Sequence, residues 1–268
     1  MGPGPSLTLN IYGRDGTRKS NLMHRDAGVI DEFELLCSIP ALKVQRLRMR
    51  RTRRVSDLQA PGNESVLITL TGSVVVETPG REPSTLAEKD VYYLSRGVKF
   101  SLQSPERADF LWAQAPAERE YPSYVKRISE VKPVASGSGT YRRSIYTSIG
   151  EKDPANRFIV GFVEGEEGNW TSFPPHRHDG KPEVYVYYGM GKRFGVQVVA
   201  GEEDRAYVVR EGDAVLFERG YHPNVATPGV GMKFVWIISA DPRDRNLSVE
   251  LHPEYRDMPM GQTHLTTK

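Results

Sequence analysis

Short hydrophobic runs separated by turn residues recur along most of the chain. In the first half the runs are 66–70, 73–78, 90–94, 99–102 and 110–113. Valine, leucine and aromatic residues fill them, and Gly72 or the Pro79-Gly80 pair stands where a run ends. Because no helical period lies between these runs, they predict the short strands of an antiparallel sandwich or barrel.

The same pattern returns in the second half with stronger strands. The runs there are 158–163, 183–188, 193–199, 206–209, 212–217 and 233–238. We therefore predict an all-β protein with two β domains in tandem. The predicted divisions are an N-terminal arm at 1–30, a first domain at 31–117, a connector at 118–150, a second domain at 151–256 and a tail at 257–268. Within the connector, 136–139 is expected to be the flexible point, and 141–146 is expected to be a strand.

An arginine-rich segment precedes these hydrophobic runs, at residues 42–54. Residues 42–50 alternate with a period of two, and six arginines fall within 46–54. Such a cluster could bind nucleic acid. However, no aromatic residues interleave with it and no nucleic-acid motif accompanies it, so we expect a solvated strand or a contact between subunits.

Composition and charge narrow the class of protein. Of the 268 residues 38% are hydrophobic, the mean hydropathy is -0.50, and no apolar run approaches the length of a membrane span. The net charge of +2 argues neither for nor against nucleic acid. Cys37 is the single cysteine, so no internal disulfide can form. Because an apolar signal-peptide core is also lacking, we expect a soluble cytoplasmic protein with neither a membrane nor a nucleic-acid partner.

The segment 168–183 carries the strongest chemical signal. His176 and His178 are separated by one residue, and alternate side chains of a strand share a face. Glu183 follows after enough residues for a tight turn, and His222 stands at a later turn. Three imidazoles and a carboxylate on a β scaffold form a site for a divalent transition metal, with positions left open for substrate. Zinc, manganese, iron and nickel all suit these ligands.

These motifs resemble those of the cupin double-sheet jelly roll. The first cupin motif is matched by Gly168, His176, His178, Glu183 and a glycine at Gly189 or Gly191, and the second by Gly212, Asp213, Gly220, His222 and Asn224. The stretches 168–179 and 220–229 are further similar to the bicupin isomerases. That family includes 5-deoxyglucuronate isomerase of myo-inositol catabolism and 5-keto-4-deoxyuronate isomerase of pectin breakdown.

The resemblance implies two cupin domains in tandem, a bicupin. Residues 31–117 contain no histidine, so the metal site of the first domain is expected to be absent. The implied activity is metal-dependent aldose–ketose isomerisation of a deoxyuronate, with 5-deoxyglucuronate as the first candidate and 5-keto-4-deoxyuronate as the alternative. The chain departs from the family in a shorter loop between His178 and Glu183 and in the segment 236–238, which bear on the substrate, not on the fold or the metal.

Isomerisation also needs a group that moves a proton between two adjacent carbons. Tyr185 and Tyr187 lie two and four residues after Glu183, so on a strand they share its face. Tyr221 is next to His222. Each tyrosine could equally be a packing residue, and Glu183 could itself move the proton, so the identity of the general base stays open.

A uronate substrate carries a carboxylate, which arginine or lysine binds well. Lys181, Arg193 and Arg219 flank the motifs, and Gln197 shares a strand face with Arg193, where it could contact sugar hydroxyls. Arg177 alternates away from the ligand histidines and is the weakest of the cationic candidates. We expect one cation in the pocket to bind a small-molecule sugar acid.

Two other functions fit the same pattern. A cupin dioxygenase would hold iron with the same ligands and bind oxygen. A non-catalytic sugar-binding bicupin is the other alternative, and the intact ligands of the second half argue against it. We also expect a homo-oligomer formed through the arm and the ligand-free first half, because that half keeps its β pattern without a site.

Overall fold

The computed structural model describes residues 22–23, 30–178, 180–263 and 265–267. Within these ranges the chain is all-β, as predicted, and its only helical segments are three single 3-10 turns, η1 (Ile128–Glu130), η2 (Gly139–Tyr141) and η3 (Pro253–Tyr255). None of these turns has the length and apolarity needed to cross a membrane.

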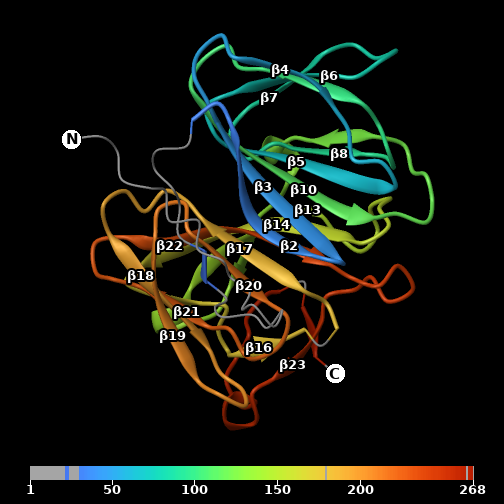
Figure 1. The fold of residues 1–268 in the computed structure, drawn as a ribbon. Coiled ribbons are helices and arrows are strands. Elements are labelled where there is room, and N and C mark those ends of the chain that lie inside the picture. Colours follow the sequence, from blue (N-terminus) through green and yellow to red (C-terminus); the bar gives the residue numbers. More distant parts are fainter. Residues whose placement is uncertain (1–21, 24–29, 179, 264, 268) are drawn as a thin grey trace, which may run out of the picture.

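The first half of the chain forms two antiparallel sheets, drawn in blue to green in Figure 1. One sheet has six strands in the order β11 (Tyr124–Lys126), β8 (Val91–Leu94), β5 (Asn63–Thr71), β10 (Ala108–Pro116), β3 (Leu42–Met49) and β2 (Phe33–Ile39). The other has four strands in the order β4 (Arg54–Leu58), β9 (Phe100–Gln103), β6 (Val74–Glu77) and β7 (Ser84–Leu86). Each hydrophobic run predicted for this half overlaps one of these strands.

The second half repeats this arrangement with a larger sheet. Seven strands follow in the order β1 (Leu22–Met23), β20 (Ala214–Phe217), β17 (Glu183–Tyr187), β22 (Gly231–Ser239), β14 (Phe158–Glu167), β13 (Arg143–Ile149) and β12 (Val134–Ser136). A four-stranded sheet has the order β15 (Trp170–Thr171), β21 (Asn224–Ala226), β18 (Phe194–Val199) and β19 (Arg205–Arg210). A three-stranded sheet has the order β16 (His176–Arg177), β23 (Ser248–Leu251) and β24 (Thr266–Thr267).

The two large sheets pack against each other in the middle of the molecule (Figure 1). On β10, Phe110 enters the core inside the first pair of sheets, while its neighbour Leu111 enters the core shared by the two large sheets. On β14, Ile159 enters the core inside the second pair, and Phe158 enters the shared core. Because both faces of these strands are buried, their sequences are continuous hydrophobic runs without strict alternation.

A buried carboxylate also joins the two halves. Glu64 of β5 is fully buried, and it accepts hydrogen bonds from the backbone N–H groups of Asn156 and Arg157, both at 2.7 Å. The hydroxyl of Tyr93 donates to the same carboxylate at 2.7 Å. These bonds hold the start of β14 against the six-stranded sheet, so the position of the second half relative to the first depends on polar contacts as well as on the shared core.

The arginine-rich segment has a different role from the one expected. Arg46 of β3 is 1% exposed, forms an ion pair with Asp109, and donates to the carbonyl of Gly212 at 2.9 Å. Arg51 and Arg53 are exposed in the turn that follows β3. The expectation of a solvated strand or a subunit contact is therefore wrong for Arg46, because this residue connects the two halves of one chain.

The predicted connector contributes three strands. β11 lies in the six-stranded sheet, whereas β12 and β13 lie in the seven-stranded sheet, and β13 overlaps the strand expected at 141–146 from Arg143 onward. At the expected flexible point, the Ser136 hydroxyl and the Gly137 N–H both donate to the carbonyl of Met260 at 3.0 Å. The connector and the tail are therefore bonded to each other.

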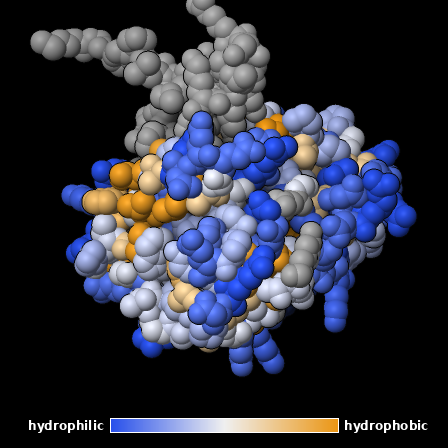
Figure 2. Space-filling view, turned by 90° about the horizontal axis from the view of Figure 1, so that it is seen from below, coloured by the Kyte–Doolittle hydropathy of each residue, from blue (hydrophilic) through white to orange (hydrophobic). Residues whose placement is uncertain are grey.

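Part of the predicted arm lies outside the described residues, namely 1–21 and 24–29. Leu22 and Met23 pair antiparallel with Val215 and Ala214 of β20. The face of the molecule in Figure 2 is covered mainly by hydrophilic residues. Among the described residues, the exposed large hydrophobic side chains are those of Ile30, Leu35, Phe194 and Val208.

Candidate metal centre

The His176–His178 pair lies at the edge of the three-stranded sheet. β16 pairs antiparallel with β23, so that His176 is opposite Leu251. The Pro174-Pro175 pair lacks two backbone donors directly before β16, and proline is confined to edge strands or strand entries for that reason. Accordingly, β16 has a partner strand on one side only within the described residues.

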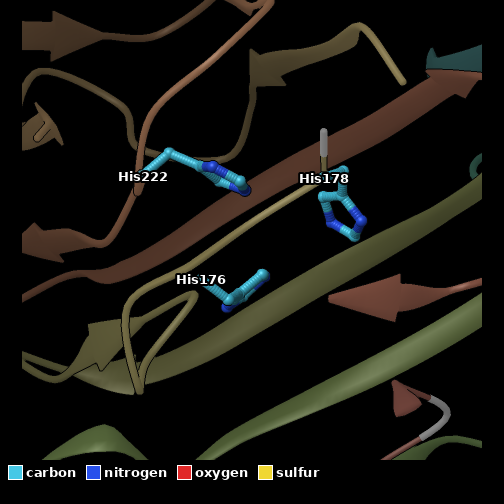
Figure 3. A group of neighbouring side chains, drawn as sticks. All are labelled: His176, His178 and His222. Carbon is cyan, nitrogen blue, oxygen red and sulfur yellow. The ribbon is translucent and has the colours of Figure 1, made fainter. Parts of the chain in front are cut away.

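Three imidazoles converge on one point (Figure 3). The rings of His176, His178 and His222 are 5%, 7% and 1% exposed, and one nitrogen of each lies within 4.8 Å of the others. Their ring centroids are 5.0 to 5.7 Å apart. The structure therefore brings together the three histidines that the sequence pattern singles out, although His222 comes from a turn more than forty residues away.

Backbone carbonyls orient two of these rings. Nδ1 of His176 is 2.9 Å from the carbonyl oxygen of Pro174, and Nδ1 of His222 is 3.0 Å from that of Gly220. With the proton on Nδ1, the lone pair of Nε2 is left for the centre of the group, as in many metal sites. Gly220 has a φ of +94°, and a Cβ there would lie 2.9 Å from the carbonyl oxygen of Ala200, so the turn that presents His222 requires glycine.

Glu183 of β17 approaches the same group. Its Oε2 lies 3.2 Å from Nε2 of His222 and 3.6 Å from Nε2 of His178. Oε2 of Glu183, Nε2 of His222 and Nδ1 of His178 are all buried without a hydrogen-bond partner. Buried polar atoms without partners are costly, and a cation at the centre would satisfy the inward-facing ones. This set of donors therefore fits a divalent metal ion. The three imidazoles lie close to one another, and the Glu183 carboxylate lies beside two of them, those of His178 and His222.

Burial keeps the histidines in the form that a metal needs. Burial, followed by the neighbouring His222, lowers the pKa of His176 to about 3. Burial, followed by His176, lowers the pKa of His178 well below its ordinary value. Both rings are therefore neutral at pH 7, and a neutral imidazole has a lone pair to donate.

His176, His178 and Glu183 line a partly open cavity of about 50 Å³, which has room for a few water molecules. His176, His178 and Glu183 form its polar wall together with Ser172 and Tyr185. The apolar residues of its lining are Ile145, Val163, Trp236, Ile238, Leu247 and Leu265. A small molecule in this cavity would have its reactive polar end beside the histidines and its carbon chain against hydrocarbon.

Of the three candidate tyrosines, Tyr185 lines the cavity. Its hydroxyl is 2.8 Å from Oγ of Ser172, and burial, followed by the charge of Glu183, raises its pKa well above the ordinary value. Tyr187 donates to Oε1 of Gln197 at 2.6 Å, away from the cavity. Tyr221 donates to Oε1 of Glu250 at 3.3 Å and is also outside the cavity lining.

The predicted substrate-binding residues lie outside the cavity. Lys181 donates to the side chain and the carbonyl of Asn246 at 2.6 and 3.0 Å. Arg193 is exposed and donates to the carbonyl of Pro228 at 2.6 Å. Arg219 is exposed in the turn before His222. These side chains belong to strands and turns near the motif in sequence, but the sheets direct them to the surface or to other loops.

Gln197, the fourth of these residues, lies behind the metal centre. Its Nε2 donates to the carbonyls of His222 and Pro223 at 2.9 and 3.1 Å, and its Oε1 accepts from Tyr187 and Asn224. It is fully buried. Its contacts therefore hold the backbone that carries His222, and it does not line the cavity.

The one cationic residue in the described lining of the cavity, Arg143, is absent from the sequence-based candidates. Arg143 of β13 is 4% exposed and lines the cavity together with Ile145 and Thr147 of the same strand. These residues alternate along β13, so their side chains share one face. The alternation is readable in the sequence, but β13 lies in the predicted connector, outside the expected second domain.

Comparison with known proteins matches this chain to one family and to relatives that are named as isomerases. A model of the KduI/IolB family matches residues 27–258. The 5-deoxy-glucuronate isomerase of Geobacillus kaustophilus (strain HTA426) is 38% identical over 127 residues, which cover 43% of this chain and 46% of that protein. This chain thus spans about half of the length of that relative. The 4-deoxy-L-threo-5-hexosulose-uronate ketol-isomerase of Shouchella clausii (strain KSM-K16) is 30% identical over 190 residues, which cover 66% of this chain and 67% of that protein.

Solved structures show the same fold at lower identity. An iolb-like protein from Salmonella typhimurium LT2 superposes with a TM-score of 0.73 at 17% identity, over 81% of this chain and 89% of that one. Oxalate decarboxylase from Bacillus subtilis superposes with a TM-score of 0.58 at 16% identity, over 75% and 69% of the two chains. At these identities the likeness concerns the fold alone, which is cupin-like.

Proposed function

Because the chain belongs to the KduI/IolB family, we propose that it is a metal-dependent isomerase that interconverts the aldose and ketose forms of a deoxyuronate. The 5-deoxyglucuronate reaction is the first candidate, since the first relatives carry that name. The ketol-isomerase reaction on 4-deoxy-L-threo-5-hexosulose-uronate is the alternative. The observation that carries the proposal is the close group of three buried imidazoles and one buried carboxylate, of which His176, His178 and Glu183 line a cavity.

The proposed architecture is a bicupin, with one cupin domain at 31–117 and the second at 151–256 joined by β12 and β13. The bicupin architecture is supported by the presence, in each half, of a large sheet and a four-stranded sheet. In the first half Trp112 contacts Phe33 and Phe100 at ring-centroid distances of 5.5 and 5.1 Å. Aromatic side chains thus fill the interior of the first half, which accords with a domain that has no metal site.

The ion would be held by His176, His178, Glu183 and His222. This assignment is supported by the closeness of the three imidazoles and by the buried atoms of His178, Glu183 and His222 that lack hydrogen-bond partners. A divalent ion bound there supplies Lewis-acid stabilisation of the negative charge that develops on the substrate oxygen during isomerisation. Zinc, manganese, iron and nickel all accept this mixture of imidazole and carboxylate.

The chain's own residues would move the proton and exclude water. Glu183 and Tyr185 are the described cavity residues, apart from the histidines, best suited to exchange a proton. Because burial raises the pKa of Tyr185 well above its ordinary value, its hydroxyl keeps the proton at neutral pH and would donate to a substrate oxygen, which leaves Glu183 as the candidate base. The apolar wall, which includes Trp236 and Leu247, keeps water from the reacting carbons.

Elemental analysis of the purified protein, combined with an isomerisation assay on both deoxyuronates, tests the proposal. We expect a stoichiometric transition metal, turnover of one of the two substrates, and loss of turnover on chelation that added metal restores. Undiminished turnover in a metal-free preparation would contradict the assignment. Consumption of dioxygen without an isomerised product would favour a dioxygenase instead.

A further inference from the structure

Arg143 places a buried positive charge in the same cavity as His176 and His178, two of the three converging histidines. Its side chain is 4% exposed and lines the cavity with His176 and Tyr185. It is also near enough to His176 for its charge to contribute to the lowered pKa of that histidine. A ligand a few bonds long could therefore touch the guanidinium and the metal centre at the same time.

This guanidinium has no counter-ion among the described residues. One donor, Nη1, bonds the carbonyl of Tyr141 at 3.2 Å, and no described carboxylate forms an ion pair with Arg143. Burial lowers its pKa to about 10, so the group is still charged at pH 7. A buried charge that keeps most of its donors without protein partners is costly, and an anionic ligand in the cavity would offset that cost.

No other cationic side chain competes for this role within the described lining of the cavity. Arg177, which lies between the two histidines in the sequence, forms an ion pair with Glu250 at 2.8 Å. Lys181 bonds Asn246 outside the cavity. The planar fork of an arginine also matches the two oxygens of a carboxylate better than a lysine does.

We propose that Arg143 binds the carboxylate of the substrate and thereby selects sugar acids over neutral sugars. This inference rests on the proposed function, because it takes the reacting end of the same molecule to lie at the three histidines. The carboxylate and the reactive carbonyl are held at two points of one cavity, so the orientation of the substrate is fixed as well as its charge.

The test compares Arg143→Gln and Arg143→Lys with a matched control, Arg142→Gln. Arg142 is the preceding residue, but its side chain is 58% exposed and pairs with Glu166 on the surface. Each metal-loaded variant is assayed on the deoxyuronate and on the corresponding deoxyhexose, in which a hydroxymethyl group replaces the carboxylate. Metal content and thermal unfolding are measured on the same preparations.

With Arg143→Gln we expect KM for the deoxyuronate to rise about 100-fold or more, because a buried charge-assisted pair is lost. The preference for the deoxyuronate over the deoxyhexose should fall by the same factor, and metal content should not change. Arg143→Lys should recover part of the loss, since it restores the charge without the fork. Arg142→Gln should behave like the wild type.

An unchanged preference for the deoxyuronate in Arg143→Gln would overturn the inference while leaving the isomerase intact. An equal loss on both substrates would do the same, since it would indicate a structural role. If the wild type isomerises neither deoxyuronate, the proposed function fails, and calorimetry with glucuronate as a probe then decides the role of Arg143 separately. Binding by the wild type that Arg143→Gln lacks would support the anion site, and equal binding by both would refute it.

Discussion

Replacing Gln197 with methionine is the most informative test of how the metal centre is held. The side chain of Gln197 makes five hydrogen bonds, with the Tyr187 hydroxyl, the Asn224 amide and the carbonyls of Val198, His222 and Pro223. Methionine has a similar volume but neither donates nor accepts these bonds. The substitution therefore removes the polar support of the His222 turn without opening a large cavity.

The expected cost follows from the groups left without partners. Pro223 keeps a second bond, from the N–H of Val198 at 2.9 Å, so its carbonyl stays satisfied. The Tyr187 hydroxyl, one Asn224 N–H and the His222 carbonyl lose the partner that Gln197 supplies. At about 1 to 3 kcal/mol for each buried group left unpaired, and allowing for some relaxation, the free energy of unfolding should fall by roughly 3 to 6 kcal/mol. Metal affinity should also weaken by about 10 to 100-fold, which is usual when a residue that orients a metal ligand is removed.

Denaturant unfolding of the metal-free protein and zinc competition with a chelator measure the two quantities. Gln103→Met is the control, because Gln103 is exposed and should change stability by less than about 0.5 kcal/mol. If Gln197→Met instead raises KM for the sugar acid and leaves metal affinity unchanged, the reasoning is refuted. The side chain would then contact substrate, as its position in the sequence suggested, and would not support His222.

Three further predictions concern the same structure. The double variant His176→Ala, His178→Ala should contain no metal and show no turnover, which elemental analysis and the isomerase assay check; bound metal would disprove the ligand assignment. Because burial lowers the pKa of His176 to about 3 and that of His178 well below 6.5, the folded metal-free protein binds fewer protons than the unfolded chain. Its stability should be full above about pH 6.5 and fall as the pH drops toward 3, by up to about 1.4 kcal/mol per pH unit for each histidine, and the double variant should lack this slope in denaturant titrations. Glu64→Gln should lower the free energy of unfolding by about 3 kcal/mol or more, because an amide group would face the backbone N–H groups of Asn156 and Arg157; a change below about 0.5 kcal/mol would contradict the proposed link between the halves.

Much of the fold was readable from local patterns. The hydrophobic runs correspond to strands such as β5, β10, β14 and β22, because a strand's period of two and its turn residues are properties of consecutive residues. The sheet partners of the strands in the predicted connector were not readable in this way. β12 pairs with β13 and β13 pairs with β14, so their place in the seven-stranded sheet depends on partners that no local period identifies, although a strand at 141–146 was itself expected.

The sequence by itself determined the donor chemistry: His176 and His178 share a face in any extended strand, and a carboxylate and a third imidazole follow on the same β scaffold. Only the tertiary structure decided which other side chains meet them. Lys181 is close to the motif in sequence yet bonds Asn246, while Arg143 comes from an earlier strand and lies in the cavity. The physical reason is that spacing along one strand sets which residues face together, whereas the pairing and packing of separate strands sets what that face encloses.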